Sequence, residues 1–203
     1  MAVTRAAAAV AVVLGLTTSG CPSSQGAPST APSPVTSPSP SSSAPVTTAN
    51  PAEDAQAQAI ALVPTYLRMI DDLYLDPSRP LDDIYEVAVG SEATAEATAI
   101  GMFRSQGYRQ IGRAELVTAT ADSVDLEGDP AASPSPTLPT VLVTTCVDVS
   151  QVQAVDEAGN PVVPSGRPEY LVARLSVVNL KYPDASSWRV SEAVNTQAQS
   201  CDE

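Results

Sequence analysis

The residues that could carry chemistry in this chain are few, and one type is missing. The 203 residues include three cysteines and no histidine. The absence of histidine excludes Ser-His-Asp and Cys-His catalytic arrangements, histidine zinc sites and the usual proton shuttle near neutral pH. The acidic stretch at residues 122–129 lacks the spacing of an EF-hand loop, and we interpret it as a strand end that runs into a loop. We therefore expect no metal and no cofactor.

The first cysteine, Cys21, follows a segment with the pattern of a secretory signal. Residues 1–20 begin with one positive charge, at Arg5, and continue with an apolar run at residues 6–16 and then small residues. The run is shorter than the roughly 20 residues that span a bilayer. The order Thr-Ser-Gly-Cys at residues 18–21 resembles the bacterial lipobox. This implies a cleaved signal peptide and a lipidated Cys21; in the alternative, ordinary signal peptidase cleaves nearby and leaves a free thiol.

The other two cysteines lie in the part that should fold. Three cysteines in an exported chain leave one unpaired when two form a disulfide, and lipidation of Cys21 accounts for the odd one. Cys146 and Cys201 can then pair in an oxidising compartment. The bond would close a loop of about 56 residues and hold the C-terminal end. The alternative is two reduced cysteines, one of them buried.

Composition divides the chain into a signal peptide at residues 1–20, a tether at 21–50 and one domain at 51–203. The tether is dominated by Pro, Ser, Thr and Ala and has no apolar periodicity, so we expect it to be disordered. The chain carries 23 acidic and 10 basic residues, which disfavours nucleic-acid binding. Any membrane attachment therefore needs a cause other than electrostatics, which lipidation of Cys21 would supply.

Helices are expected first in the domain. Asn50 and Pro51 predict a helix start, and the helix should end near Leu75. We expect a kink or restart near Ile60, because Pro64 lacks the backbone N–H that would close the helical ladder. One face is apolar at three- and four-residue steps: Ile60, Val63, Leu67, Ile70 and Tyr74.

Two shorter helices should follow, over residues 81–89 and 91–106. Ser91 is the expected N-cap of the second of these, and Gly107 should stop it. Its apolar side would comprise Ala93, Ala97, Ile100 and Phe103.

Beyond Tyr108 the residues become β-branched and partly alternating. Four stretches, 114–128, 139–155, 169–180 and 186–194, predict three or four long antiparallel strands plus a short hairpin. Helices followed by strands indicate an α+β domain, with helices packed on one face of a curved antiparallel sheet of 3–5 strands.

This order of elements resembles the NTF2-like superfamily of cone-shaped α+β domains, which includes ketosteroid-isomerase-like and polyketide-cyclase-like proteins. The stretches "YLRMIDDLYLDPSRPLDDIYEVAVG", "TTCVDVSQVQAVDEAGNPV" and the closing "SC" also resemble actinobacterial lipoproteins of unknown function. The resemblance covers about residues 52–201 and carries almost no reaction chemistry.

The resemblance implies a pocket between the helices and the concave face of the sheet. Enzymes of this superfamily use a buried Asp or His with a Tyr, so the candidates here are Tyr66, Tyr85 or Tyr108 with Asp122 or Asp148. We interpret the pairs Asp71–Asp72 and Asp82–Asp83 as solvated helix faces or caps. Trp188 should pack against a helix, or else line the pocket. The candidate lining residues are Tyr66, Tyr85, Phe103, Tyr108 and Trp188.

The resulting hypothesis is a non-catalytic lipoprotein on the outer face of the cell membrane, which binds a small apolar ligand or an envelope protein. One alternative is a cone-pocket enzyme of isomerase or cyclase type. Another is a surface exclusion or protective lipoprotein, including one encoded by a phage. A secreted form and a dimer formed through the open sheet face are further alternatives.

Overall fold

The computed structural model describes residues 50–129 and 131–202. The predicted signal peptide, the lipidation of Cys21 and the tether lie outside the described residues. The elements, in chain order, are α1 (Pro51–Leu75), η1 (Leu81–Glu86), α2 (Gly90–Ser105), β1 (Arg109–Ile111), β2 (Glu115–Asp125), β3 (Thr140–Asp148), β4 (Gln153–Val155), β5 (Tyr170–Asn179), η2 (Ala185–Ser187) and β6 (Trp188–Ala198).

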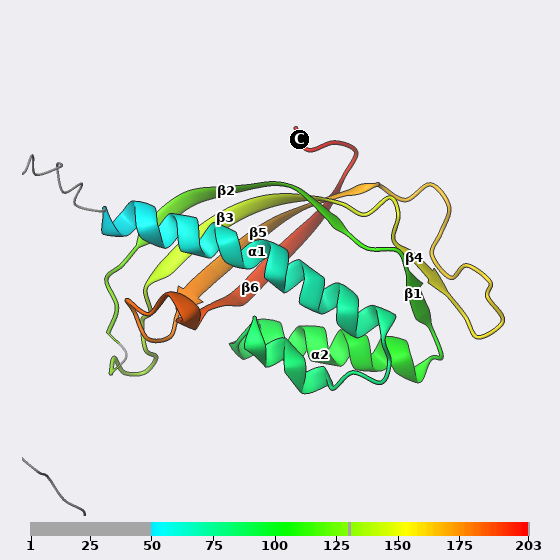
Figure 1. Cartoon of the computed structure of the whole chain (residues 1–203), viewed down its shortest axis with the longest axis horizontal. Helices are drawn as coiled ribbons and strands as arrows, with labels where there is room; N and C mark the ends of the chain where they lie inside the picture. Colours follow the sequence, from blue (N-terminus) through cyan, green and yellow to red (C-terminus); the bar gives the residue numbers. More distant parts are fainter. Residues whose placement is uncertain (1–49, 130, 203) are drawn as a thin grey trace, which may run out of the picture. The chain divides into compact units, whose positions relative to one another are not determined.

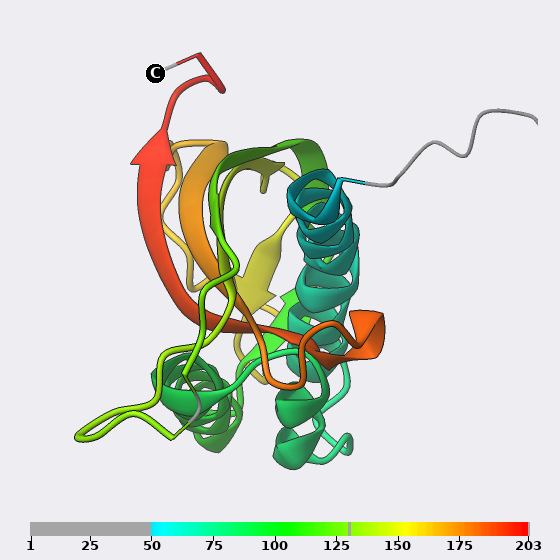
Figure 2. The same cartoon turned by 90° about the vertical axis from the view of Figure 1, so that its left-hand side faces the viewer.

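The predicted α+β class is confirmed, with helices on one side of a curved antiparallel sheet in the manner of an NTF2-like cone. Four long strands are ordered β2-β3-β5-β6, and all their pairings are antiparallel. The short strands β1 and β4 form a separate two-stranded sheet. Figures 1 and 2 show α1 and α2 on the concave side of the four-stranded sheet. Register shifts within β2 and between β5 and β6 increase the bend, because an extra residue twists the strand locally.

Helix α1 begins and ends where the sequence predicts. The side chain of Asn50 accepts a hydrogen bond from the backbone N–H of Ala52 at 3.1 Å, and the last helical residue is Leu75. The predicted restart near Ile60 is wrong, because α1 continues without interruption through Pro64. Pro64 lies on the exposed face of α1. Proline has no N–H to donate to the carbonyl four residues earlier, and at this face water can hydrogen-bond that carbonyl instead.

The connection between η1 and α2 differs from the sequence prediction because the chain pairs with β6. The expected helix at 81–89 is a six-residue 3₁₀ helix, and the backbones of Val87 and Val89 then exchange hydrogen bonds with Val190 at 2.9 and 2.8 Å. Ser91 is not an N-cap, since its hydroxyl donates to the carbonyl of Ser191 at 3.4 Å. The predicted stop is confirmed: Gly107 follows the C-cap with φ of +72°, a conformation that favours glycine.

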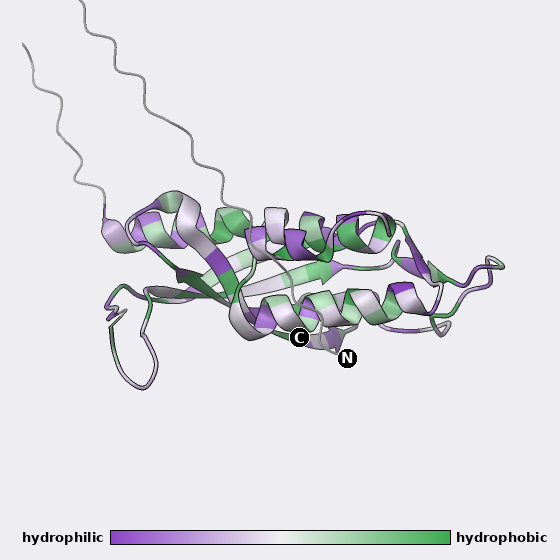
Figure 3. Ribbon diagram, turned by 90° about the horizontal axis from the view of Figure 1, so that it is seen from below, coloured by the Kyte–Doolittle hydropathy of each residue, from purple (hydrophilic) through white to green (hydrophobic). Residues whose placement is uncertain are grey.

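The main core lies between the helices and the concave face of the sheet. Successive side chains of a strand point to opposite faces of the sheet. Val141, Val143 and Val177 point inward, toward the helices, and are at most 1% exposed. The helices contribute Val63, Leu73 and Ile100 among others. Figure 3 shows that hydrophilic and hydrophobic residues occur together along both helices, as expected for helices with one face in the core and one in solvent.

The predicted disulfide between Cys146 and Cys201 is present, with the two Cα atoms 5.6 Å apart. Cys146 follows Thr145 on β3 and therefore points to the convex face, away from the helices. The bond thus fixes the C-terminal segment on the face opposite the core. Within the part of the chain that the structure describes, no helix is long and apolar enough to cross a membrane.

Candidate functional site

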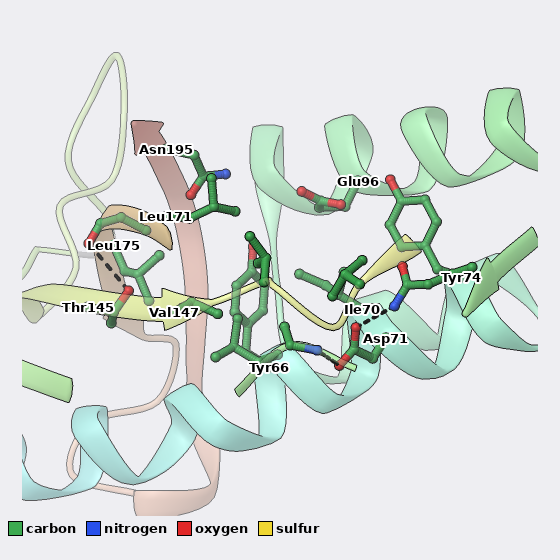
Figure 4. A pocket seen from close by; sticks show the side chains of 16 residues that line it. Tyr66, Ile70, Asp71, Tyr74, Glu96, Thr145, Val147, Leu171, Leu175 and Asn195 are labelled. Atoms are coloured by element: carbon green, nitrogen blue, oxygen red, sulfur yellow. Dashed lines mark hydrogen bonds between the residues drawn. The ribbon is translucent and has the colours of Figure 1, made fainter. Parts of the chain in front are cut away.

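A cavity of about 230 Å³ lies between α1, α2 and the concave face of the sheet. Figure 4 shows its side chains. Helix α1 provides one wall, because positions 66, 67, 70, 71 and 74 share one helix face. The sheet provides the opposite wall through the inward residues of β3 and β5, and the row from Thr145 through Ala173 continues to Asn195 on β6. The lining comprises Tyr66, Leu67, Ile70, Asp71, Tyr74, Glu96, Gln110, Ala114, Thr145, Val147, Val149, Val152, Leu171, Ala173, Leu175 and Asn195.

A buried carboxylate beside the cavity joins three elements. Glu92 on α2 is 7% exposed, and one of its oxygens accepts a hydrogen bond from the hydroxyl of Tyr66 on α1. Its other oxygen accepts from the backbone N–H of Ala193 on β6 at 2.9 Å. Each oxygen of Glu92 thus accepts one hydrogen bond from a different element. Burial and the neighbouring Glu92 raise the pKa of Tyr66 far above its ordinary value, so this phenol keeps its proton.

Glu96 lies one helical turn after Glu92 and lines the cavity itself. In the described part of the chain, its carboxyl has no hydrogen-bond or ion-pair partner. Burial, with a further contribution from the charge of Glu92, raises the pKa of Glu96 to about 7. The carboxyl therefore exists in both protonation states near neutral pH. Burial and the proximity of Glu96 raise the pKa of Tyr74, on α1, to about 12.

Asp71 is buried, at 5% exposed, so the interpretation of this residue as part of a solvated helix face is wrong. Its carboxylate accepts hydrogen bonds from the side chain of Gln110 at 2.7 Å and from the backbone N–H of Ala114 at 3.0 Å. Burial raises its pKa, although these two hydrogen bonds act in the opposite direction. Asp71 thus attaches β1 and the following turn to α1 and closes one end of the cavity.

Neighbouring Asp72, in contrast, lies at the surface. It forms ion pairs with Arg79 at 2.9 Å and with Arg113 at 2.7 Å. Arg79 also pairs with Asp83 at 2.8 Å, while Asp82 is exposed. These three acidic residues therefore belong to the outer surface, and only Asp71 reaches the cavity.

Comparisons with known proteins reveal similarity to solved structures but not to a family or a curated protein. No family model matches the chain, and no curated protein matches it. Among solved structures, the chain is similar to the intermembrane space region of the chloroplast protein ARC6, with a TM-score of 0.47 and 16% sequence identity. The likeness covers 70% of this chain and 97% of that one.

Of the five aromatic residues expected to line the pocket, the structure places Tyr66 in the cavity. Tyr85 lies on η1 and is 49% exposed. The ring of Phe103 packs edge-to-face against Tyr74, with centroids 5.0 Å apart, and against Tyr108, with centroids 5.7 Å apart. Neither Phe103 nor Tyr108 lines the cavity. Trp188 is 2% exposed and packs elsewhere in the core.

Trp188 packs against the N-terminal half of α1. Its indole N–H donates to the side-chain oxygen of Gln58 at 2.8 Å. Trp188 thus packs against a helix, which was the first of its two predicted arrangements, and does not line the cavity.

The two aspartates proposed as partners of a tyrosine lie away from the cavity. Asp122 on β2 accepts a hydrogen bond from Thr144 at 2.6 Å, and this threonine belongs to the convex face of the sheet. Asp148 ends β3 and accepts a hydrogen bond from the backbone N–H of Ser150 at 2.7 Å. Hydrogen bonds from the side chain and then the backbone of Ser150 lower the pKa of Asp148. Neither of these candidate aspartates therefore meets a tyrosine at the cavity.

The acidic groups that do face the cavity, Glu96 and Asp71, were missed, as was the adjoining Glu92. One signal was present: Glu92 and Glu96 are spaced by four residues and border the apolar side that contains Ala93 and Ala97.

No cluster of three or more metal-ligating side chains occurs among residues 50–129 and 131–202.

Proposed function

We propose that this chain is a lipid-anchored extracytoplasmic binding protein whose cavity holds one small, largely apolar molecule. The observation that carries the proposal is the cavity itself: its walls are mainly Val, Leu, Ile and Ala side chains, with a few polar groups. Ligand sites in proteins have this composition, because apolar walls supply affinity and isolated polar groups orient the ligand.

The size of the cavity sets the size of the ligand. Benzene fits a dry apolar cavity of about 150 Å³. A cavity of about 230 Å³ therefore accommodates a bicyclic aromatic molecule or a short branched chain. A long acyl chain would have to extend beyond it.

Export and anchoring rest on the N-terminal sequence and are supported by the disulfide between Cys146 and Cys201, which suits an oxidising compartment. The test is the intact mass of the protein from the membrane fraction, before and after reduction. We expect a chain that starts at Cys21, carries a diacylglyceryl group and gains two hydrogens on reduction. An unmodified chain in the medium would contradict the anchor.

Ligand binding is tested with 1-naphthalenemethanol, a neutral bicyclic probe, by titration calorimetry on the full chain. We expect saturable binding at one site. Ala173 on β5 lines the cavity, so Ala173→Ile should fill it and weaken binding at least tenfold. Val194→Ile is the matched control, because Val194 lies on the convex face and is 56% exposed. No binding, or equal binding by the wild type and Ala173→Ile, would contradict the proposal.

A second candidate function is proton transfer in the same cavity. Glu96 favours it, since a half-buried carboxyl in a cavity, with a pKa of about 7 and no hydrogen-bond partner in the described chain, suits a general base. The test is exchange of the α-hydrogens of a small ketone with deuterated water. Acceleration by the full chain that is lost in Glu96→Gln would support an enzyme, and an unchanged exchange rate would support binding alone.

A further inference from the structure

We propose that the cavity prefers an organic amine, whose ammonium group pairs with Glu96 while its apolar body lies against β3 and β5. This inference rests on the proposed binding function and names the class of ligand. Its basis is the distribution of charged, aromatic and apolar side chains around the cavity.

The cavity has negative groups and no positive ones. Glu96 and Asp71 line it, and no Lys or Arg is among its 16 lining residues. Nearby basic side chains have other partners: Arg113 pairs with Asp72, and Arg104 donates to three backbone carbonyls around the C-terminal end of α1. An anionic ligand would therefore enter without a counter-charge, which is costly in a buried site.

The two acidic groups in the lining differ in what they can still bind. Asp71 already accepts hydrogen bonds from Gln110 and Ala114. Glu96 accepts none within the described residues, so its oxygens remain available to a donor in the cavity. The charge of Glu92 lies one turn away and raises the pKa of Glu96. A protonated amine would be attracted to both carboxylates and would relieve their mutual repulsion.

Aromatic and apolar side chains complete the arrangement. The rings of Tyr66 and Tyr74 form part of the α1 wall, and an ammonium near a tyrosine face gains a cation–π attraction. Figure 4 shows Glu96 and the hydroxyl end of Tyr74 together at one end, while Val147 and Leu171 lie toward the other. An amine with a compact apolar body matches this division.

The pH dependence follows from the groups that face Glu96. They are Glu92 on its own helix and, from α1, Tyr66 and Tyr74; Asp71, also on α1, lines the same cavity. The strands contribute only uncharged side chains to the cavity: Gln110, Thr145, Asn195 and aliphatic residues. Amine affinity should rise as pH increases through about 7, because Glu96 then loses its proton while the amine keeps its own.

The experiment compares 1-naphthylmethylamine, 1-naphthalenemethanol and 1-naphthoate on the full chain at pH 8, by titration calorimetry. The three probes share one ring system and differ in the charge of the head group. We expect the amine to bind about tenfold more tightly than the alcohol, because a charge-assisted hydrogen bond is stronger than a neutral one. Naphthoate should bind most weakly.

Glu96→Gln should reduce the amine-to-alcohol affinity ratio to near one. The matched control is Glu53→Gln, since Glu53 is exposed in the first turn of α1 and lies outside the cavity; its ratio should equal that of the wild type. At pH 6.5, titrations in two buffers with different ionisation enthalpies should show release of protons when the amine binds the wild type and none in Glu96→Gln.

The outcomes separate the inference from the function on which it rests. Failure of both the alcohol and the amine to bind would overturn the proposed function. Binding of the alcohol with no preference for the amine, or an unchanged ratio in Glu96→Gln, would overturn only the amine preference.

Discussion

The disulfide between Cys146 and Cys201 should contribute a large share of the stability of the domain. The paired cysteines are separated by 55 residues in the sequence. In the chain-entropy model, a crosslink that closes a loop of this length restricts the unfolded chain by about 4 kcal/mol. For a domain of about 150 residues, such a loss should lower the melting temperature by roughly 8 to 16 °C.

The perturbation is reduction of the bond in a chain that keeps both sulfurs. A Cys21→Ser parent removes the third thiol, and reduction of this parent then measures the effect of the covalent bond alone. The double variant Cys146→Ala/Cys201→Ala serves as a comparison, because it also removes side-chain atoms from a site where Cys146 is 3% exposed. The assay is urea unfolding of the oxidised and reduced forms, followed by circular dichroism.

Both reduced and double-alanine forms should stay folded, because β6 pairs with β5 as far as Ala198 without help from the crosslink. The loss should appear as a shift of the midpoint, and the amides near the C-terminal end of β6 should exchange faster with solvent. A difference of less than 1 kcal/mol between oxidised and reduced forms would refute the reasoning, since the loop would then restrict the unfolded chain very little.

Three further predictions concern the groups around the cavity. Tyr66→Phe should lower the free energy of unfolding in urea by about 1 to 3 kcal/mol, because a buried oxygen of Glu92 loses its donor; a double-mutant cycle with Glu92→Gln that shows no coupling energy would contradict this. Glu96 has a folded-state pKa raised to about 7, so its contribution to stability is complete below its unfolded pKa and is lost as pH rises through 7. The wild type should therefore lose about 1 to 3 kcal/mol relative to Glu96→Gln between pH 4.5 and 7.5, and parallel stability profiles would exclude a raised pKa. Asp71→Asn should lower the free energy of unfolding by about 2 kcal/mol in the same urea assay, because an amide has one acceptor oxygen for the two donors that now bind Asp71. An equal loss in Gln110→Ala would contradict this reason, since the hydrogen bond from the glutamine would then account for the whole effect.

The sequence predicted the fold well where the signal is local. Asn50 and Pro51 mark the start of α1, and the change to alternating β-branched residues after Tyr108 marks the sheet. It failed at Ser91, because the partner of this hydroxyl is on β6, 100 residues away in the chain. The same kind of long-range pairing turned the expected second helix into a 3₁₀ helix.

The site was harder to predict for the same reason. Glu92 is placed by Tyr66, 26 residues away, and by Ala193, 101 residues away, and no periodicity within α2 contains that information. Residue type was also a poor guide, since Phe103 and Trp188 have the aromatic character of pocket residues but pack elsewhere. What sequence could supply was the acidic four-residue spacing beside an apolar helix face.

The carboxylate of Glu92 also constrains how a molecule enters and leaves. It is hydrogen-bonded to α1 through Tyr66 and to β6 through Ala193, so α2 cannot move away from either without exposing an unsatisfied charge inside the domain. Separation of the helices would therefore cost the free energy of these two buried hydrogen bonds. Asn195, at the rim of the cavity, is exposed, and rotation of such surface side chains takes picoseconds to nanoseconds. For the ligand proposed above, we therefore expect exchange to be governed by the rim, with a residence time that depends on how well the ligand fits the cavity.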